Sequence, residues 1–103
     1  MDKEQLKDHI VQALKTVYDP EIPIDIYELG LIYGLEINDE GEVDIRMTLT
    51  SPACPEAQSI PPAVQRAAER VEGVAVARVE LVWEPPWDKN MMSEAARLHL
   101  GFF

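Results

Sequence analysis

Cysteine is almost absent from this sequence: Cys54 is the only one among 103 residues. One thiol cannot form a disulfide within the chain, so a disulfide-stabilised secreted scaffold is excluded. The sequence also lacks the paired Cys-x-x-Cys motifs from which dedicated metal–sulfur scaffolds take their ligands. Cys54 is therefore a candidate for chemistry rather than for covalent bracing.

Basic residues and long apolar runs are also scarce. The chain has 9 Lys and Arg against 19 Asp and Glu, a formal net charge of −10. This balance disfavours nucleic acid and anionic membrane surfaces as partners, and it favours solubility and a basic protein partner. No run approaches the roughly 20 apolar residues that span a bilayer, and residues 1–5 do not begin an ordinary signal peptide. We expect a cytoplasmic protein.

What is present predicts one domain over residues 1–103, since this length and a hydrophobic fraction of 47% are typical of a single globular unit. Apolar spacing predicts a first helix from Asp2 to about Tyr18 and a second around 61–73. Period-two alternation predicts a hairpin, with Tyr33, Leu35 and Ile37 on the inward face of its first strand. The predicted strands are 31–38, 42–49 and 76–83, and the last helix is 91–100.

The predicted order is helix, strand, strand, helix, strand, helix. The simplest packing for it is an α/β fold of the α+β type, a small three-stranded mixed sheet with helices packed on one face.

Cys54 lies between Pro52 and Pro55, at the junction of a predicted strand and a predicted helix. A helix N-terminus favours the thiolate, so the position suits a reactive or ligating thiol. A small buried hydrophobic residue is the alternative, because free cysteines are often buried. Both interpretations stay open from position alone.

Four polar residues flank this position in the predicted fold. Asp19 and Glu21, in the proline-rich stretch 19–23, are candidate ligating or acid–base carboxylates, although an Asp before proline is also common in turns. Thr48 and Thr50 share one side of the second strand and come close to Cys54 in the sequence. Threonine also favours strands for packing reasons alone.

The tail is rich in tryptophan, methionine and phenylalanine. It is either a packed cap over the core or a surface that docks a partner, because such residues and arginine are enriched at interface centres. The candidate docking residues are Trp83, Trp87, Met91, Met92 and Arg97.

Three blocks of the sequence resemble the SufT-like and PaaD-like family of small iron–sulfur cluster assembly factors. The first is 19–23 with 29–33, and the second is 47–50 with 54–55. The third is 83–87 followed by Met91, Ser93, Glu94, Ala96-Arg97 and Leu100-Gly101. The resemblance implies a small α/β domain and an accessory role in the maturation of iron–sulfur proteins. It places the family's motif cysteine at Cys54, its acidic loop at Asp19 and Glu21, and its threonines at Thr48 and Thr50.

The leading hypothesis is a non-enzymatic factor that helps to assemble clusters or deliver them to client apo-proteins. A cluster needs about four ligands and the chain has one thiol, so we expect no stably bound cofactor. Cys54 would bind iron or a cluster transiently, or share it between subunits of a homodimer. The partners would be iron–sulfur assembly proteins and client apo-proteins. The alternatives are a thiol-reactive Cys54 enzyme and a non-catalytic subunit of a phenylacetyl-CoA oxygenase-type complex.

Overall fold

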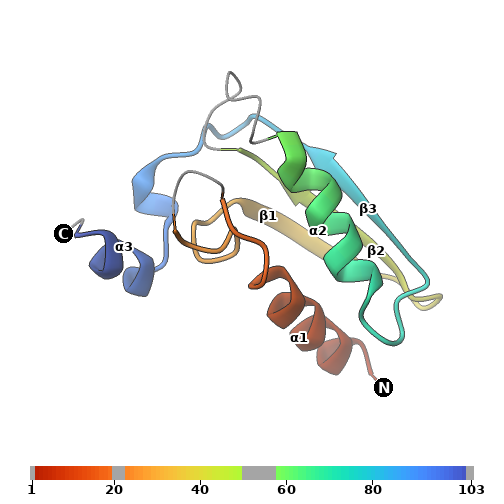
Figure 1. Ribbon diagram of the computed structural model, residues 1–103. Coiled ribbons are helices and arrows are strands. Elements are labelled where there is room, and N and C mark those ends of the chain that lie inside the picture. The colour runs from red at the N-terminus through yellow and green to blue at the C-terminus, as the bar shows by residue number, and fades with distance from the viewer. Residues whose placement is uncertain (1, 20–22, 50–57, 102–103) are drawn as a thin grey trace.

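The order of the helices and strands confirms the predicted fold class. The computed structural model describes residues 2–19, 23–49 and 58–101, drawn in Figure 1. The elements are α1 (Lys3–Leu14), β1 (Ile32–Ile37), β2 (Glu42–Met47), α2 (Ile60–Glu69), β3 (Val76–Leu81), the 3-10 helix η2 (Lys89–Met91) and α3 (Glu94–Leu100). No helix in these three ranges is both long enough and apolar enough to span a bilayer.

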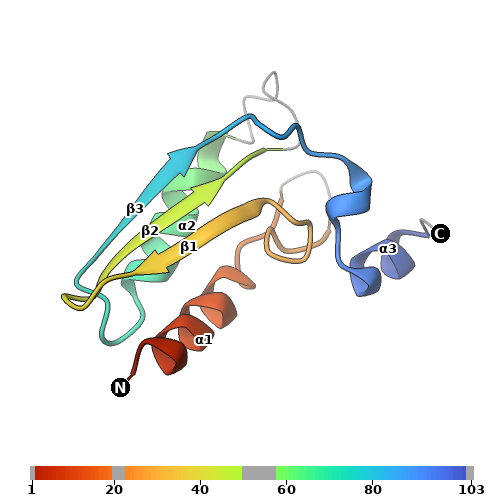
Figure 2. The same ribbon diagram turned by 180° about the vertical axis from the view of Figure 1, so that it is seen from behind.

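The three strands form one mixed sheet in the order β1-β2-β3. The hairpin pair β1 and β2 is antiparallel, whereas β2 and β3 are parallel and are joined through α2. Val43, Ile45 and Met47 of β2 are almost fully buried. Helices α1 and α2 lie on one side of the sheet, and α3 lies beyond one end of it (Figures 1 and 2). The core therefore sits between the sheet and the first two helices.

Local sequence signals account for how the two long helices begin. Asp2 caps α1: its Oδ1 accepts a hydrogen bond from the Gln5 backbone N–H at 2.8 Å, and the Gln5 side chain accepts one from the Asp2 N–H. Pro61 and Pro62 fall in the first turn of α2, where backbone N–H groups need no intrahelical partner. The predicted starts of both helices are confirmed.

The first helix ends earlier than predicted, at Leu14 rather than near Tyr18. Its last turn tightens, since the N–H groups of Thr16 and Val17 donate to carbonyls three residues back. The Val17 carbonyl oxygen then accepts from Ile26 N–H at 2.8 Å, and Tyr18 forms an isolated bridge with Asp25. Residues 17 and 18 thus pair with residues 25 and 26 instead of continuing the hydrogen bonds of the helix.

The predicted inward position of Tyr33 is wrong. The pairing of β1 with β2 shifts by one residue between Ile32 and Gly34, so Ile32 rather than Tyr33 pairs with a buried residue of β2. Such a bulge turns the side chains on one side of it to the other face. Leu35 and Ile37 pack against the core as predicted, while Tyr33 is left on the helix-free face.

The C-terminal part is more irregular than predicted. Strand β3 ends at Leu81, so Trp83 follows it and is 43% exposed. The last helix begins at Glu94 and not at residue 91, because Ser93 is extended and its Oγ accepts a hydrogen bond from the Ala96 N–H. Residues 82–93 therefore cross the end of the sheet mostly without regular structure.

Candidate functional site

A chain of backbone hydrogen bonds joins distant segments at one end of the sheet. The Thr48 N–H donates to the Leu31 carbonyl oxygen at 2.9 Å, and the Leu31 N–H donates to Ile26 at 3.2 Å. Ile26 in turn donates to Val17, two residues before Asp19. The predicted site residues Asp19 and Thr48 therefore belong to neighbouring segments at the same end of the sheet.

Asp19 and Thr48 are the two buried polar side chains in the part of the chain that the structure describes. Their exposed fractions are 6% and 1%. Burying a polar side chain costs free energy unless its polar atoms are satisfied. Such residues in a small core need a reason, and a site at this end of the sheet supplies one. Their role in that site stays a prediction.

Three predicted site residues, Glu21, Thr50 and Cys54, lie outside the described residues. The segment that carries Glu21 joins Asp19 to Pro23, and the one that carries Cys54 joins Leu49 to Gln58. Leu49 is 5% exposed, and Ile60, at the start of α2, is 2% exposed. Both flanks of the Cys54 segment are therefore anchored in the core.

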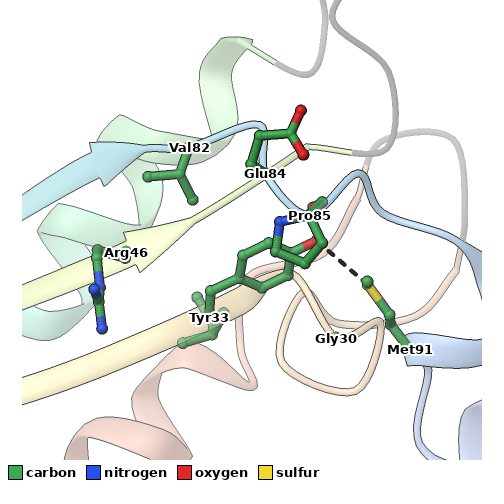
Figure 3. A pocket seen from close by; sticks show the side chains of 8 residues that line it. Gly30, Tyr33, Arg46, Val82, Glu84, Pro85 and Met91 are labelled. Atoms are coloured by element: carbon green, nitrogen blue, oxygen red, sulfur yellow. Dashed lines mark hydrogen bonds between the residues drawn. The ribbon is translucent and has the colours of Figure 1, made fainter.

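A pocket of about 630 Å³ opens on the helix-free face at this end of the sheet. Figure 3 shows Tyr33 beside Pro85 and Met91, with Arg46 further along β2. The lining residues are Gly30, Ile32, Tyr33, Arg46, Val82, Glu84, Pro85 and Met91. Apolar walls with one cation and one carboxylate suit a side chain or short segment of a partner.

Tyr33 forms one wall of this pocket, and two contacts of its hydroxyl group hold its side chain in place. Its hydroxyl donates to the Pro85 carbonyl oxygen at 2.8 Å and lies 3.3 Å from Met91 Sδ. Partial burial, together with the negative charge of Asp88, raises the pKa of the Tyr33 phenol above its ordinary value of 10.0. The phenol is therefore neutral near pH 7 and remains a hydrogen-bond donor.

Arg46 is a pocket residue that sequence reasoning missed. Its guanidinium lies so close to Gly34 that a Cβ there would stand 2.6 Å from Nη2. Arg46 also forms a long ion pair with Glu36, at 3.8 Å, on the same face. The available signal was Gly34 itself, since a glycine inside a strand often marks a bulge or a close approach.

The predicted docking residues occupy different environments. Trp87 is half-buried and its Nε1 donates to the Leu29 carbonyl oxygen at 2.7 Å, and Met92 is 5% exposed. Both belong to the packed cap that the sequence left open as an alternative. Met91 lines the pocket, Arg97 is half-buried and Trp83 is exposed. Of the predicted docking residues, Trp83 is thus the exposed one and Met91 the one that borders the pocket.

No group of three or more His, Cys, Asp or Glu side chains within 2–19, 23–49 and 58–101 is arranged to hold a metal ion. The described part of this end therefore offers hydrogen-bonding groups, a pocket and anchored flanks.

Comparison with known proteins supplies the biological context. A family described as "Iron-sulfur cluster assembly protein" matches residues 7–81. A "Fe-S protein maturation auxiliary factor" from Porphyromonas gingivalis is 49% identical over 98 residues, which cover 95% of this chain and 93% of that protein. A protein of the same description from Bacillus subtilis, YitW, is 41% identical and covers 96% of this chain and 97% of its own.

A solved structure supports the same relationship. The crystal structure of a domain of unknown function from Bacillus anthracis superposes with a TM-score of 0.88 and is 36% identical in sequence. The match covers 97% of this chain and 95% of that one. The similarity therefore extends over the whole architecture, including the irregular C-terminal part.

Proposed function

Because the chain belongs to the family of iron–sulfur cluster assembly proteins, we propose that it is a non-enzymatic accessory factor whose Cys54 handles iron or a cluster in transit. A role in the maturation of iron–sulfur proteins follows from its relatives, which are named as auxiliary factors. The finer assignment is that Cys54 transiently ligates the cargo or contacts the cysteines of a client apo-protein.

The observation that carries this proposal is the burial of Asp19 and Thr48 at the end of the sheet where the Cys54 segment begins. Thr48 precedes that segment by one buried residue, Leu49, and α2 begins soon after it. The described residues on both sides of that segment are therefore fixed in the core. Fixed flanks suit a segment whose thiol must meet the ligands of another protein.

The number of ligands decides how cargo could be held. A cluster takes about four protein ligands, usually thiolates, and this chain supplies one thiol. The remaining ligands would come from a second copy in a homodimer, an assembly protein or the client. No resident cofactor is required in this scheme, and the protein would work in the cytoplasm with those partners.

Docking of the partner is assigned to the pocket beside Tyr33 and to exposed Trp83. The pocket opens at the same end of the sheet as Thr48. Its apolar walls and Arg46 suit an apolar side chain accompanied by a carboxylate. A client or assembly protein bound there would approach the Cys54 segment from the helix-free face.

The test of the thiol role uses Cys54→Ser and Cys54→Ala in cells that depend on this protein. Both variants should keep the fold, measured by circular dichroism, and should lower the activities of iron–sulfur enzymes to the level of the deletion strain. Glu80→Gln, an exposed change on β3, is the matched control and should leave those activities intact. Wild-type enzyme activities in both cysteine variants would contradict the proposal.

Anaerobic reconstitution with iron and sulfide separates the two modes of action. Visible absorption, bound iron per chain and molecular mass are compared for wild type and Cys54→Ser. A cluster that needs Cys54 and accompanies dimer formation indicates a carrier that bridges two chains. If a cluster forms equally well without Cys54, the thiol is not one of its ligands and the proposed role of Cys54 is wrong.

A further inference from the structure

A second concave surface lies on the opposite side of the molecule, in the groove where the chain leaves α1 and passes α2. Its volume is about 310 Å³. It is lined by Thr16, Val17, Tyr18, Ala63, Arg66, Ala67 and Arg70. None of these lining residues is acidic, although acidic residues outnumber basic ones two to one in the chain.

The α2 side of the groove follows helical spacing. Residues 63, 66, 67 and 70 recur at intervals of three and four, so they share one face of the helix. Ala63 and Ala67 are small and form the floor, with Ala67 5% exposed. Arg66 and Arg70 are exposed and stand on the rim. The small floor residues leave space that larger side chains would fill.

The two rim arginines differ from three other cations of this protein, which form ion pairs. Lys3 pairs with Asp39, Arg46 with Glu36, and Arg78 with both Glu42 and Asp44. Within the described ranges, neither Arg66 nor Arg70 forms an ion pair. Two like charges four residues apart also weaken a helix slightly. An anionic group bound in the groove would form ion pairs with both arginines and would reduce the repulsion between them.

Tyr18 gives the groove an apolar end. Its side chain is 59% exposed, which makes it one of three exposed large hydrophobic residues in the described structure. Exposed tyrosine next to arginine is a composition enriched in protein interfaces. The surface therefore combines two cations, a small apolar floor and one aromatic ring.

We propose that this groove binds a short acidic segment of a partner protein. Carboxylates of the segment would pair with Arg66 and Arg70, and an apolar side chain would lie on Ala63 and Ala67 against Tyr18. A long polyanion such as nucleic acid fits poorly, because it would run from this small patch onto a surface of net charge −10. The proposal does not depend on Cys54, so it stands or fails separately from the proposed function.

The experiment uses the full chain and a fluorescein-labelled peptide of alternating glutamate and leucine, with a glutamine-for-glutamate peptide as the control. Fluorescence polarisation should show binding of the acidic peptide only, and binding should weaken with salt, as charge screening requires. Arg66→Gln with Arg70→Gln should weaken binding roughly tenfold. Lys7→Gln with Arg78→Gln removes the same charge elsewhere and should leave the affinity unchanged.

Amide chemical shifts locate the peptide on the surface. Changes confined to residues 16–18 and 63–70 support the proposal. It is overturned if both double variants weaken binding equally, or if the glutamine peptide binds as well. Inorganic phosphate that competes at the same concentration as the peptide would assign the groove to a free anion. A dimer that is lost only in the Arg66→Gln, Arg70→Gln variant would assign it to a second copy. Each of these two results also overturns the proposal.

Discussion

The two ends of the sheet are built in different ways. At the hairpin end, Asn38 Oδ1 accepts hydrogen bonds from the N–H groups of Glu40 and Glu42, two and four residues away. At the other end, Tyr33 donates to Pro85 and Trp87 donates to Leu29, across 52 and 58 residues. The hairpin turn is closed by hydrogen bonds within the turn itself, with Lys3 and Ala75 as its distant partners, whereas the other end is closed by side-chain hydrogen bonds to segments far along the chain.

The hairpin end is therefore the structural end of the sheet, and the end with Tyr33 and Trp87 is the one that carries the candidate site. Long-range contacts form only after the chain has met the entropic cost of closing large loops. A region that lacks local hydrogen bonds and depends on a few long-range ones opens at a lower free energy than the core does. We expect the hairpin end to remain closed while the end with Tyr33 and Trp87 opens locally, and the predictions below test that contrast.

The largest loss of stability should come from Gly30→Ala, at the end of the sheet opposite the hairpin. Gly30 has φ of +81°, and a Cβ there would stand 2.1 Å from the Met91 carbonyl oxygen. Left-handed strain and displacement of η2 together should lower the free energy of unfolding by about 3–4 kcal/mol. Urea unfolding followed by circular dichroism measures this change.

Gly101→Ala is the matched control for that substitution. Its φ is +83°, but a Cβ there meets nothing within 4 Å among the described residues. The variant should lose only the conformational term, about 1 kcal/mol. Equal losses in the two alanine variants would mean that contact between Gly30 and η2 contributes nothing to stability.

An intermediate effect is expected for Trp87→Phe. The ring is largely kept, but the carbonyl oxygen of buried Leu29 loses its donor, which should cost about 1–3 kcal/mol. Amide hydrogen exchange should accelerate around residues 28–31 and stay slow in the hairpin. Trp83→Phe, at an exposed position, should change stability by less than about 0.5 kcal/mol. If amide hydrogen exchange accelerates equally at both ends of the sheet, the proposed difference in local stability between the two ends is wrong.

The smallest effect concerns the hairpin end and depends on pH. A hydrogen bond from Lys3, together with the charge of its ammonium, lowers the pKa of the Asp39 carboxyl below its ordinary value of 3.8. A depressed pKa in the folded state stabilises the protein above the ordinary value, and this contribution is lost as the pH falls through the folded pKa. Asp39→Asn should therefore reduce the fall in melting temperature between about pH 6 and about pH 3.

Glu40→Gln controls for this pH experiment. It removes the same charge from the same turn, and Glu40 forms no ion pair in the described part of the chain. Its pH profile should parallel that of the wild type. If Asp39→Asn and Glu40→Gln give identical profiles, the ion pair with Lys3 is irrelevant to acid stability.

The contrast between the two ends also explains what the sequence could predict. Period-two alternation from Val43 to Met47 gave the central strand, and Gly41, with φ of +79°, closes the predicted hairpin turn. The capping box at Asp2 and the prolines at the start of α2 act within a few residues, so their consequences could be inferred locally. The element order and the fold class follow from such signals.

Two of the errors fall where distant segments meet, whereas the start of the last helix depends on a local cap at Ser93. The end of α1 depends on Ile26 as a partner for Val17, and the bulge at Tyr33 accompanies its contact with Pro85. Neither partner is visible in a local pattern. Of the candidate site, the sequence selected Asp19 and Thr48, which the fold places in neighbouring segments, but it missed Arg46, because an arginine on an alternating strand resembles an ordinary solvated side chain. The assignments of Cys54, Glu21 and Thr50 remain predictions.

The hydrogen bond between Trp87 and Leu29 has an optical consequence. The chain has two tryptophans, and both lie in the segment that crosses the end of the sheet. Trp83 is exposed, whereas the indole of Trp87 is half-buried and bonded to a main-chain carbonyl. Intrinsic tryptophan emission therefore arises entirely from this end of the sheet. Release of Trp87 into water would shift that emission to longer wavelength, so the rate of local opening can be measured without an attached label.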